Sequence, residues 1–310
     1  MKKTTKLLFL MIAGALACAC VKSEVDKQSI SFSPVASKAT KAIIDGTTYP
    51  TSESFVVSAY YGGTAAYFED LTASYNSSLD LWETSTPEYW PLGGSLTFQA
   101  YSPASAGLTI DASGVSIDGY TVQTAGQMTT DLCYASYTVA DCTVHDPVPL
   151  VFSHALSQVV FKVKAAAYYS NVTFSLDALS LGGLFSVGNF SEGAWSDHSS
   201  EHDYSISSTP TTLTYTDEEP DVTEIAAYLF LPQTIGDDAT LNVTYSITQN
   251  VSGTDYTVNN PPVSIALKNS VSQLESGKKY IFTINIGLDL INFTASTVAW
   301  EEKEGGVVVE

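Results

Sequence analysis

The sequence predicts an all-β protein, and two observations carry this prediction. Short runs rich in β-branched and aromatic residues recur along the chain, separated by Gly, Ser, Asn, Asp and Pro. In several runs apolar residues alternate with small polar ones, which is typical of half-buried antiparallel strands. Segments with helical periodicity are scarce, and the nearest candidate, residues 154–158, is too short for a stable helix. A chain of 310 residues with this pattern is expected to form two β-sandwich domains.

The expected strands follow one another along most of the chain. They cover residues 55–61, 96–101, 159–164, 226–231, 239–248, 280–286 and 291–300. Glycine pairs at 62–63, 93–94 and 182–183 are expected to supply turns, because glycine adopts positive φ without strain. The best break between strand-rich halves follows Lys164. It predicts domains over residues 42–167 and 168–310, with the boundary placed to within about ten residues.

The first 20 residues differ in kind from the rest of the chain. Residues 1–6 carry positive charge, and residues 7–16 form an apolar run of about 15 Å as helix, half of the ~30 Å hydrocarbon core. This pattern predicts a signal peptide over residues 1–17. Cys18 and Cys20 follow among small residues, as in a bacterial lipobox. We expect an acyl chain such as palmitate on Cys18, with Cys20 as the alternative; the other reading is an ordinary signal peptide with incidental cysteines.

Charge also separates the leader from the body. The chain has 13 lysines, no arginine and 33 acidic residues, for a net charge of −20. Seven of the lysines lie at or before Lys41, so only six remain beyond it against 31 acids. Phosphate contacts need Lys and Arg, and such an acidic body would repel a polyanion. Nucleic acid is therefore excluded as a partner.

One short pattern of histidine and glutamate resembles a catalytic motif. His198, Glu201 and His202 match H-x-x-E-H, a zinc-peptidase signature that needs a helix to bring both histidines to one face. The surrounding residues are rich in Ser and Asp, which favour turns, so we expect a solvated loop. His145 and His154 are expected to be structural histidines. The sequence thus predicts no enzyme, no catalytic residue, no metal site and no cofactor.

Two cysteines remain in the body, Cys133 and Cys142. Their spacing would allow a hairpin disulfide worth roughly 2–3 kcal/mol. The alternative is a pair of small buried residues in strands, and no Cys/His pattern predicts zinc.

A set of short motifs occurs in a recognisable order. They are Ile30–Phe32, Leu96–Pro103, Asp131–Ala135 and Phe152–Leu156 in the first half, then Leu231–Gln233, Gly277–Tyr280 and Val298–Trp300. This ordered set spans nearly the whole chain and resembles the fimbrillin family of the Bacteroidales, the lipoprotein-derived subunits of type V pili. The resemblance implies two transthyretin-like β-sandwich domains in tandem. It also implies an outer-membrane lipoprotein precursor that later becomes part of a cell-surface fimbrium.

The resemblance further implies that a strand is removed from the N-terminal segment. Residues 18–41 would be a pro-segment whose strand carries Ile30 and Phe32. Cleavage is expected between Lys41 and Ala42, with Lys38 as the alternative; the family's site is commonly Arg, so the protease stays open. Removal would open a groove that a strand of the next subunit fills by β-strand addition. The other reading is that these lysines belong to an ordinary linker and the strand stays in place.

The C-terminal residues bear on the role of the subunit. Gly305 and Gly306 could hinge a short donor strand, Val307, Val308 and Val309, or these residues could be the frayed end of the last strand. A stalk subunit and a tip or accessory subunit both stay open. The expected partners are other fimbrial subunits, a processing protease, outer-membrane lipid through the acylated cysteine, and a host or bacterial adhesion ligand. The alternative function is a surface lipoprotein that binds glycans without polymerising.

Overall fold

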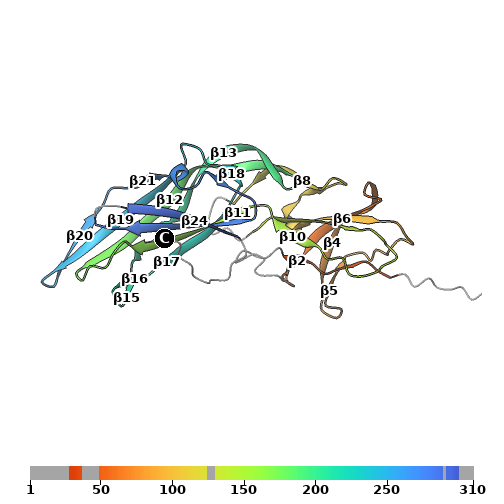
Figure 1. The fold of residues 1–310 in the computed structure, drawn as a ribbon, viewed down its shortest axis with the longest axis horizontal. Helices are drawn as coiled ribbons and strands as arrows, with labels where there is room; N and C mark the ends of the chain where they lie inside the picture. The colour runs from red at the N-terminus through yellow and green to blue at the C-terminus, as the bar shows by residue number, and fades with distance from the viewer. Residues whose placement is uncertain (1–27, 37–48, 124–129, 289–290, 300–310) are drawn as a thin grey trace, which may run out of the picture.

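The computed structural model describes residues 28–36, 49–123, 130–288 and 291–299. Apart from two 3₁₀ turns, Ala104–Ala106 and Leu267–Asn269, the regular structure of these residues consists of β-strands, which confirms the all-β prediction. The strands form two bodies that follow one another end to end along the long axis of the molecule (Figure 1). We call them the first body, with β1–β6, β9 and β10, and the second body, with β7, β8 and β11–β24.

The first body is built on one eight-stranded sheet in the order β1-β5-β4-β3-β6-β9-β10-β2. Its strands are β1 (Ser31–Phe32), β2 (Val35–Ala36), β3 (Phe55–Tyr61), β4 (Ala65–Asn76), β5 (Leu81–Thr84), β6 (Leu96–Ser102), β9 (Cys133–Val139) and β10 (Val151–His154). Neighbours are antiparallel except β2, which runs parallel to β10. β1 and β2 stand at opposite ends of this order, yet both belong to residues 28–36. That one segment therefore closes the sheet, and we call it the closing segment.

Large aromatic side chains fill the interior of the first body. The buried residues here include Phe32, Tyr49, Phe55, Trp82, Trp90, Phe98 and Phe152. Tyr49 illustrates the packing: its ring contacts Phe55 and Phe152, and its hydroxyl bonds the Ser102 hydroxyl at 2.8 Å. Burial raises the pKa of Tyr49, so this phenol stays neutral at any physiological pH.

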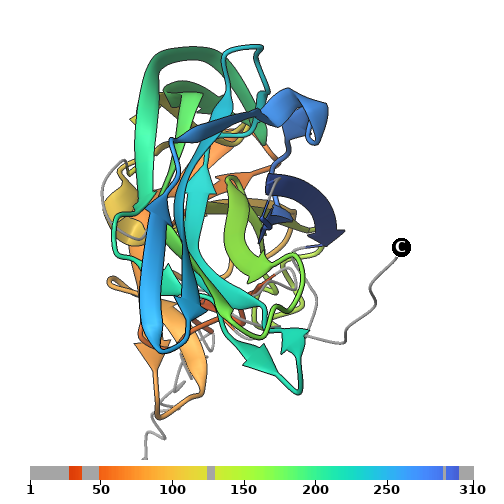
Figure 2. The ribbon, with the colours of Figure 1, turned by 90° about the vertical axis from the view of Figure 1, so that its left-hand side faces the viewer.

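The second body contains two larger sheets around a separate core. The first has the order β17-β11-β23-β24, and the second has the order β20-β19-β12-β8-β7, with β13 and β14 paired to β12 and β21 paired to β19. Figure 2 looks along the long axis and shows β19 and β20 on one side and β24 on the other. The strands of the smaller sheet are β11 (Ser157–Ala165), β17 (Thr223–Phe230), β23 (Lys278–Ile286) and β24 (Ile291–Ala299). Those of the larger sheet are β7 (Thr109–Ile110), β8 (Val115–Thr121), β12 (Val172–Ser191), β13 (Ala194–Ser207), β14 (Thr211–Thr212), β19 (Thr240–Val251), β20 (Thr254–Asn259) and β21 (Val263–Ala266).

Two short pairs of strands complete the second body. They are β15 (Tyr215–Thr216) with β16 (Glu219–Pro220), and β18 (Gln233–Thr234) with β22 (Gln273–Leu274). Aliphatic and aromatic residues of both larger sheets share the core, among them Phe161, Phe174, Leu181, Phe230, Leu241 and Phe282.

Strand pairing divides the chain differently from the expected boundary near residue 167. β11 lies before that boundary, but it pairs with β17 and, in parallel, with β23. The chain passes between the bodies at residues 155–156. This crossing lies about ten residues before the expected boundary, which was itself placed to within about ten residues. Residues 109–121 also cross over, because β8 pairs with β12 of the second body. The division at 167 itself stays a prediction.

Every strand expected from the sequence has a counterpart, while three strands of more than ten residues, β4, β12 and β13, were not among those expected. β12 spans 20 residues and contains Gly182 and Gly183 in mid-strand. The prediction of a turn at this glycine pair is wrong, because the ladder with β13 shifts register there and continues as a bulge. β13 contains the Ser-rich and Asp-rich residues around His198, so the prediction of a loop is also wrong. Pairing with β12 holds these residues extended despite their weak β propensity.

Gly183 gives a test of this bulge. Its φ is +74°, and a Cβ built on it would lie 2.5 Å from the backbone oxygen of Asp238. We expect Gly183→Ala to lower the free energy of unfolding by about 2–4 kcal/mol, because left-handed strain and a backbone clash add. Gly236→Ala is the matched control: nothing lies within 4 Å of its Cβ position and its φ is not left-handed. Equal urea midpoints for the two variants would contradict this account of the bulge.

Candidate functional site

The closing segment alternates buried and half-buried side chains along its length. Ile30, Phe32 and Pro34 are buried, whereas Ser29, Ser31 and Ser33 are only partly covered. This alternation is the period-2 pattern of a strand with one face on a core. Ile30 is 1% exposed and Phe32 is 0% exposed.

Backbone hydrogen bonds hold the closing segment on both sides. On one side Ile30 N–H donates to the Glu88 carbonyl at 2.7 Å, and Trp90 N–H donates to the Gln28 carbonyl at 3.2 Å. β1 also pairs with β5, with Phe32 opposite Trp82. Residues 28–32 of the segment therefore have antiparallel neighbours along this side.

On the other side the segment runs parallel to residues 148–151. Ser33 N–H donates to the Val148 carbonyl at 3.0 Å, Val148 N–H donates to the Ser31 carbonyl at 2.8 Å, and Val35 N–H donates to the Leu150 carbonyl at 2.8 Å. The closing segment thus lies in a groove between residues 82–90 and 148–151. Without it, both walls of this groove would be open strand edges.

Phe32 fills the deepest part of this groove. Its ring meets Phe55 and Phe98 edge to face, with 5.7 Å between ring centroids in each case. Aromatic pairs in this geometry are favourable beyond the area that they bury. Burying Ile30 and Phe32 together contributes about 3–6 kcal/mol of hydrophobic free energy.

A polar clasp fixes the start of the closing segment. Gln28 donates from Nε2 to the His145 carbonyl at 3.3 Å, and its Oε1 lies 3.1 Å from His145 Nδ1. The His145 ring stacks on Trp90 with 6.0 Å between centroids. His145 is thus a structural histidine, as expected, and it sits at the groove.

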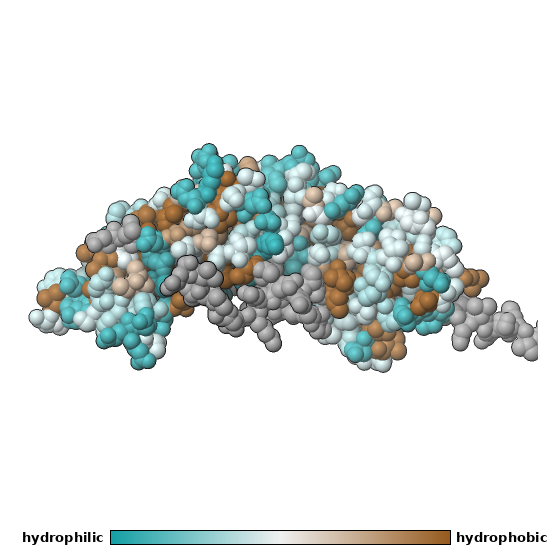
Figure 3. Space-filling view, viewed as in Figure 1, coloured by the Kyte–Doolittle hydropathy of each residue, from teal (hydrophilic) through white to brown (hydrophobic). Residues whose placement is uncertain are grey.

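The predicted site residues fall into two groups. Ile30 and Phe32 lie in the groove just described. The lipidation candidates Cys18 and Cys20, the cleavage residues Lys38, Lys41 and Ala42, and the donor residues Val307, Val308 and Val309 all lie outside the described residues. Among the residues described, no helix has the length and apolar character to cross a bilayer. On the face shown in Figure 3, hydrophobic side chains form separate patches between hydrophilic ones.

The H-x-x-E-H residues do not have the geometry of a zinc peptidase. They lie on strand β13, where His202 is opposite Leu184 and Glu201 is opposite Phe185. His198 bonds through Nε2 with the Pro232 carbonyl at 2.7 Å, so this nitrogen is engaged with the backbone. The helix that the signature requires is absent from β13, and the sequence match carries no catalytic site.

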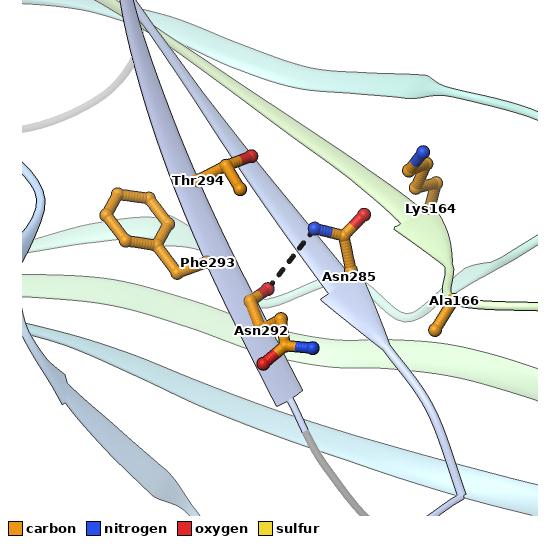
Figure 4. Close-up of a pocket in the computed structure, with 6 residues that line it drawn as sticks. All are labelled: Lys164, Ala166, Asn285, Asn292, Phe293 and Thr294. Atoms are coloured by element: carbon orange, nitrogen blue, oxygen red, sulfur yellow. Dashed lines mark hydrogen bonds between the residues drawn. The ribbon is translucent and has the colours of Figure 1, made fainter. Parts of the chain in front are cut away.

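A surface hollow beside β24 also lacks the chemistry of an active site. A cavity of about 450 Å³ is lined by Lys164, Ala166, Asn285, Asn292, Phe293 and Thr294 (Figure 4). Asn285 donates from Nδ2 to the Asn292 carbonyl at 3.4 Å, and Phe293 points to the opposite side of β24. Its lining contains no histidine, cysteine or carboxylate that could serve as an acid, a base or a nucleophile.

Cys133 and Cys142 are both buried, and both are free thiols. Sequence reasoning left open whether they form a disulfide; the structure has them as small buried residues. Cys133 lies beside Asp131 and His154 in the interior. Burial and the nearby Asp131 carboxylate raise the pKa of the Cys133 thiol well above its ordinary value. The β9–β10 register places Cys133 opposite His154. Residue spacing in the sequence does not reveal this register, so the sequence could not predict that the three residues meet.

Phe32 gives a direct test of the groove. We expect Phe32→Ala to lower the free energy of unfolding of the first body by about 3–5 kcal/mol, because it leaves a cavity between two rings. Val35→Ala is the control on the same segment, since Val35 is 38% exposed, and it should change stability by under about 0.5 kcal/mol. Urea unfolding followed by tryptophan fluorescence measures both. A Phe32→Ala protein as stable as the Val35→Ala protein would contradict a segment held by its buried side chains.

Solved structures of similar fold come from several species of Bacteroides. A fimbrial protein from Bacteroides vulgatus has a TM-score of 0.61 at 18% identity, over 87% of this chain and 99% of that chain. Proteins assigned to cell adhesion from Bacteroides ovatus and Bacteroides uniformis have TM-scores of 0.54 and 0.53 at 16% and 15% identity. They cover 90% and 88% of this chain and 99% of each of theirs. At these identities the likeness shows the fold.

Among curated protein sequences none matches this chain. A family model does: the model described as fimbrillin-like matches residues 40–300, well over half of the sequence. The resemblance noted from the ordered motifs is thereby confirmed, and the chain belongs to the fimbrillin-like family.

Proposed function

We propose that this chain is a structural subunit of a cell-surface fimbrium that supports adhesion, and that it assembles by strand exchange. The closing segment is the observation that carries this proposal. It is one short piece of chain that supplies two edges of a sheet and the central ring of a core. Family membership and the fimbrial and cell adhesion proteins of similar fold support the same role.

A structural role also accounts for the absence of catalytic chemistry in the residues considered. The fimbrillin-like family consists of structural adhesion proteins, which confirms the prediction that the chain is not an enzyme.

Proteolysis would release the closing segment. Cleavage between Lys41 and Ala42, or after Lys38, would cut beyond the last closing strand, which ends at Ala36. The severed segment would then be held only by the hydrogen bonds and side chains described above. Its loss would expose the rings of Phe55 and Phe98 and the edges at 82–90 and 148–151, a surface that favours pairing with another strand.

Two segments of a neighbouring subunit could fill the opened groove. One is Val307–Val309, expected from the sequence. The other is β24, in which Ile291 and Phe293 repeat the spacing of Ile30 and Phe32. β24 is an edge strand that pairs only with β23 among the described strands, and both side chains are only half-buried there. Moving them into the groove would complete their burial, which favours exchange. A contact of this kind is heterologous and propagates into a fibre.

The N-terminal cysteine would hold the precursor at the membrane. Acylation of Cys18, or of Cys20, would anchor the chain in the outer membrane until cleavage frees the body. The assembled fimbrium would bind an adhesion ligand on a host or bacterial surface. The subunit would occupy either a stalk position or a tip position. The tryptophans that the structure describes give no support to the glycan-binding alternative, because Trp82 and Trp90 are buried and the Trp195 indole bonds the Ala155 carbonyl.

Controlled cleavage tests the proposed function. A Lys-specific protease should remove residues up to Lys41 and leave a stable body, which should then form ladders that resist SDS. A Lys38→Gln/Lys41→Gln variant is the matched control; it should keep residues 28–36 attached to the body and stay monomeric. A trimmed body that stays monomeric, alone and with related subunits, would overturn polymerisation.

The donor segment can be separated in the same assay. If β24 is the donor, Phe293→Ala should weaken the ladders and deletion of residues 305–310 should not. The reverse result would assign the donor to Val307–Val309. Electrophoresis of both trimmed variants under identical conditions measures the difference.

A further inference from the structure

Three buried side chains with metal-binding atoms meet at the base of β9 and β10. They are Asp131, Cys133 and His154, which are 3%, 1% and 4% exposed. Asp131 and Cys133 are two residues apart and His154 is opposite Cys133 in the β9–β10 ladder. The register of the sheet therefore brings the three together from two separate stretches of chain.

The distances suit a tetrahedral metal ion. Cys133 Sγ lies 3.6 Å from Asp131 Oδ2 and 3.6 Å from His154 Nδ1. Ligand atoms at ordinary zinc–sulfur, zinc–nitrogen and zinc–oxygen lengths stand about 3.3–3.7 Å apart around a tetrahedral ion. The remaining edge is shorter, because His154 Nδ1 and Asp131 Oδ2 share a direct hydrogen bond. A metal ion would replace that shared proton and widen this edge.

The carboxylate has an unused atom at the same place. Asp131 Oδ1 is buried and has no hydrogen-bond partner among the described residues. A buried carboxylate oxygen without a partner costs folding free energy, because its lost contact with water is not replaced. A bound ligand at Asp131 Oδ1 would remove this cost. A bidentate Asp131 would bring the donor set to four atoms: two oxygens, one sulfur and one nitrogen.

Charge points in the same direction. With a metal ion bound, Cys133 would coordinate as a thiolate. The thiolate and the Asp131 carboxylate would then carry two negative charges, and a neutral imidazole would add none. A divalent cation would make this dry site electrically neutral, which is the condition for burying charged groups without a large penalty. Sulfur and imidazole donors favour zinc over magnesium or calcium, which prefer all-oxygen sites.

We propose that Asp131, Cys133 and His154 form a structural zinc site that ties β9 to the end of β10. The site lies where the chain leaves the first body, and its His154 is on β10, the strand that begins at the wall of the groove holding the closing segment. Its bond to β10 would stiffen that wall, since β10 pairs with β2. Sequence reasoning expected no metal, because the sequence contains no Cys/His pattern that predicts zinc.

Metal analysis of the full chain tests the site. The protein is made with Cys18 and Cys20 replaced by Ser, so that only the two body cysteines remain, and it is refolded with equimolar zinc. We expect one zinc per chain after dialysis, a thiolate-to-cobalt absorption band when cobalt replaces zinc, and a rise in thermal midpoint of about 5 °C over the chelator-treated protein. Cys133→Ser should lose at least nine-tenths of the bound metal.

Cys142→Ser is the matched control, because Cys142 is also a buried free thiol but lies outside the cluster. It should keep its zinc and its cobalt band. Failure of Cys133→Ser to fold would leave the wild-type and Cys142→Ser measurements to decide. No cobalt–thiolate band and no zinc-dependent midpoint in those two proteins, or zinc retained by a folded Cys133→Ser variant, would overturn the site. Neither result bears on fimbrial assembly, which is measured separately.

Discussion

Two-sided backbone pairing of residues 28–36 is the constraint on which the first body depends. A buried N–H or carbonyl without a partner is costly, so a sheet that curls around an aromatic core must close its last gap with a strand. The closing segment does this with bonds to Glu88 and Val148 on opposite sides. Its side chains complete the core at the same time, with Phe32 between two rings. Closure of the sheet and packing of the core therefore both depend on the closing segment.

The second body provides a platform that does not depend on this segment. Its core is separate from the cluster that contains Phe32, and it extends to Val56, Tyr60 and Tyr101 of the first body. Side chains of the β12–β13 hairpin add further contacts with the first body. Phe190 packs against Tyr134 with 5.2 Å between ring centroids, and Trp195 Nε1 donates to the Ala155 carbonyl at 2.6 Å. Gly193, with φ at +88°, lets the hairpin turn tightly beside the Tyr134 ring. Loss of the closing segment would thus open a groove in a molecule whose other contacts persist, which is what an exchange reaction needs.

Local patterns were enough to predict much of the fold, and long-range pairing accounts for the rest. β3, a run rich in β-branched and aromatic residues, and β23, which alternates, were both found from sequence alone. β13 was missed because Ser, Asp and His have weak strand preference, and only its ladder with β12 holds it extended. The sheet membership of β11 depends on a parallel partner more than 110 residues later, which no local signal reveals.

The candidate site shows the same division. Ile30 and Phe32 were identified through the family resemblance, but their burial and their pairing on two sides required the structure. The grouping of Asp131 with His154 depends on β-sheet register, to which residue spacing gives no access. The residues of cleavage, lipidation and the predicted C-terminal donor remain predictions from sequence.

Amide hydrogen exchange at Val148 and Trp90 tests the central claim most directly, because the closing segment accepts the hydrogen bonds of both amides. The account predicts strong protection of both amides in the uncleaved protein, loss of protection once residues 1–41 are removed, and renewed protection in the assembled ladders. Protection that persists in the trimmed monomer would contradict it, since the groove walls would then be closed without the segment.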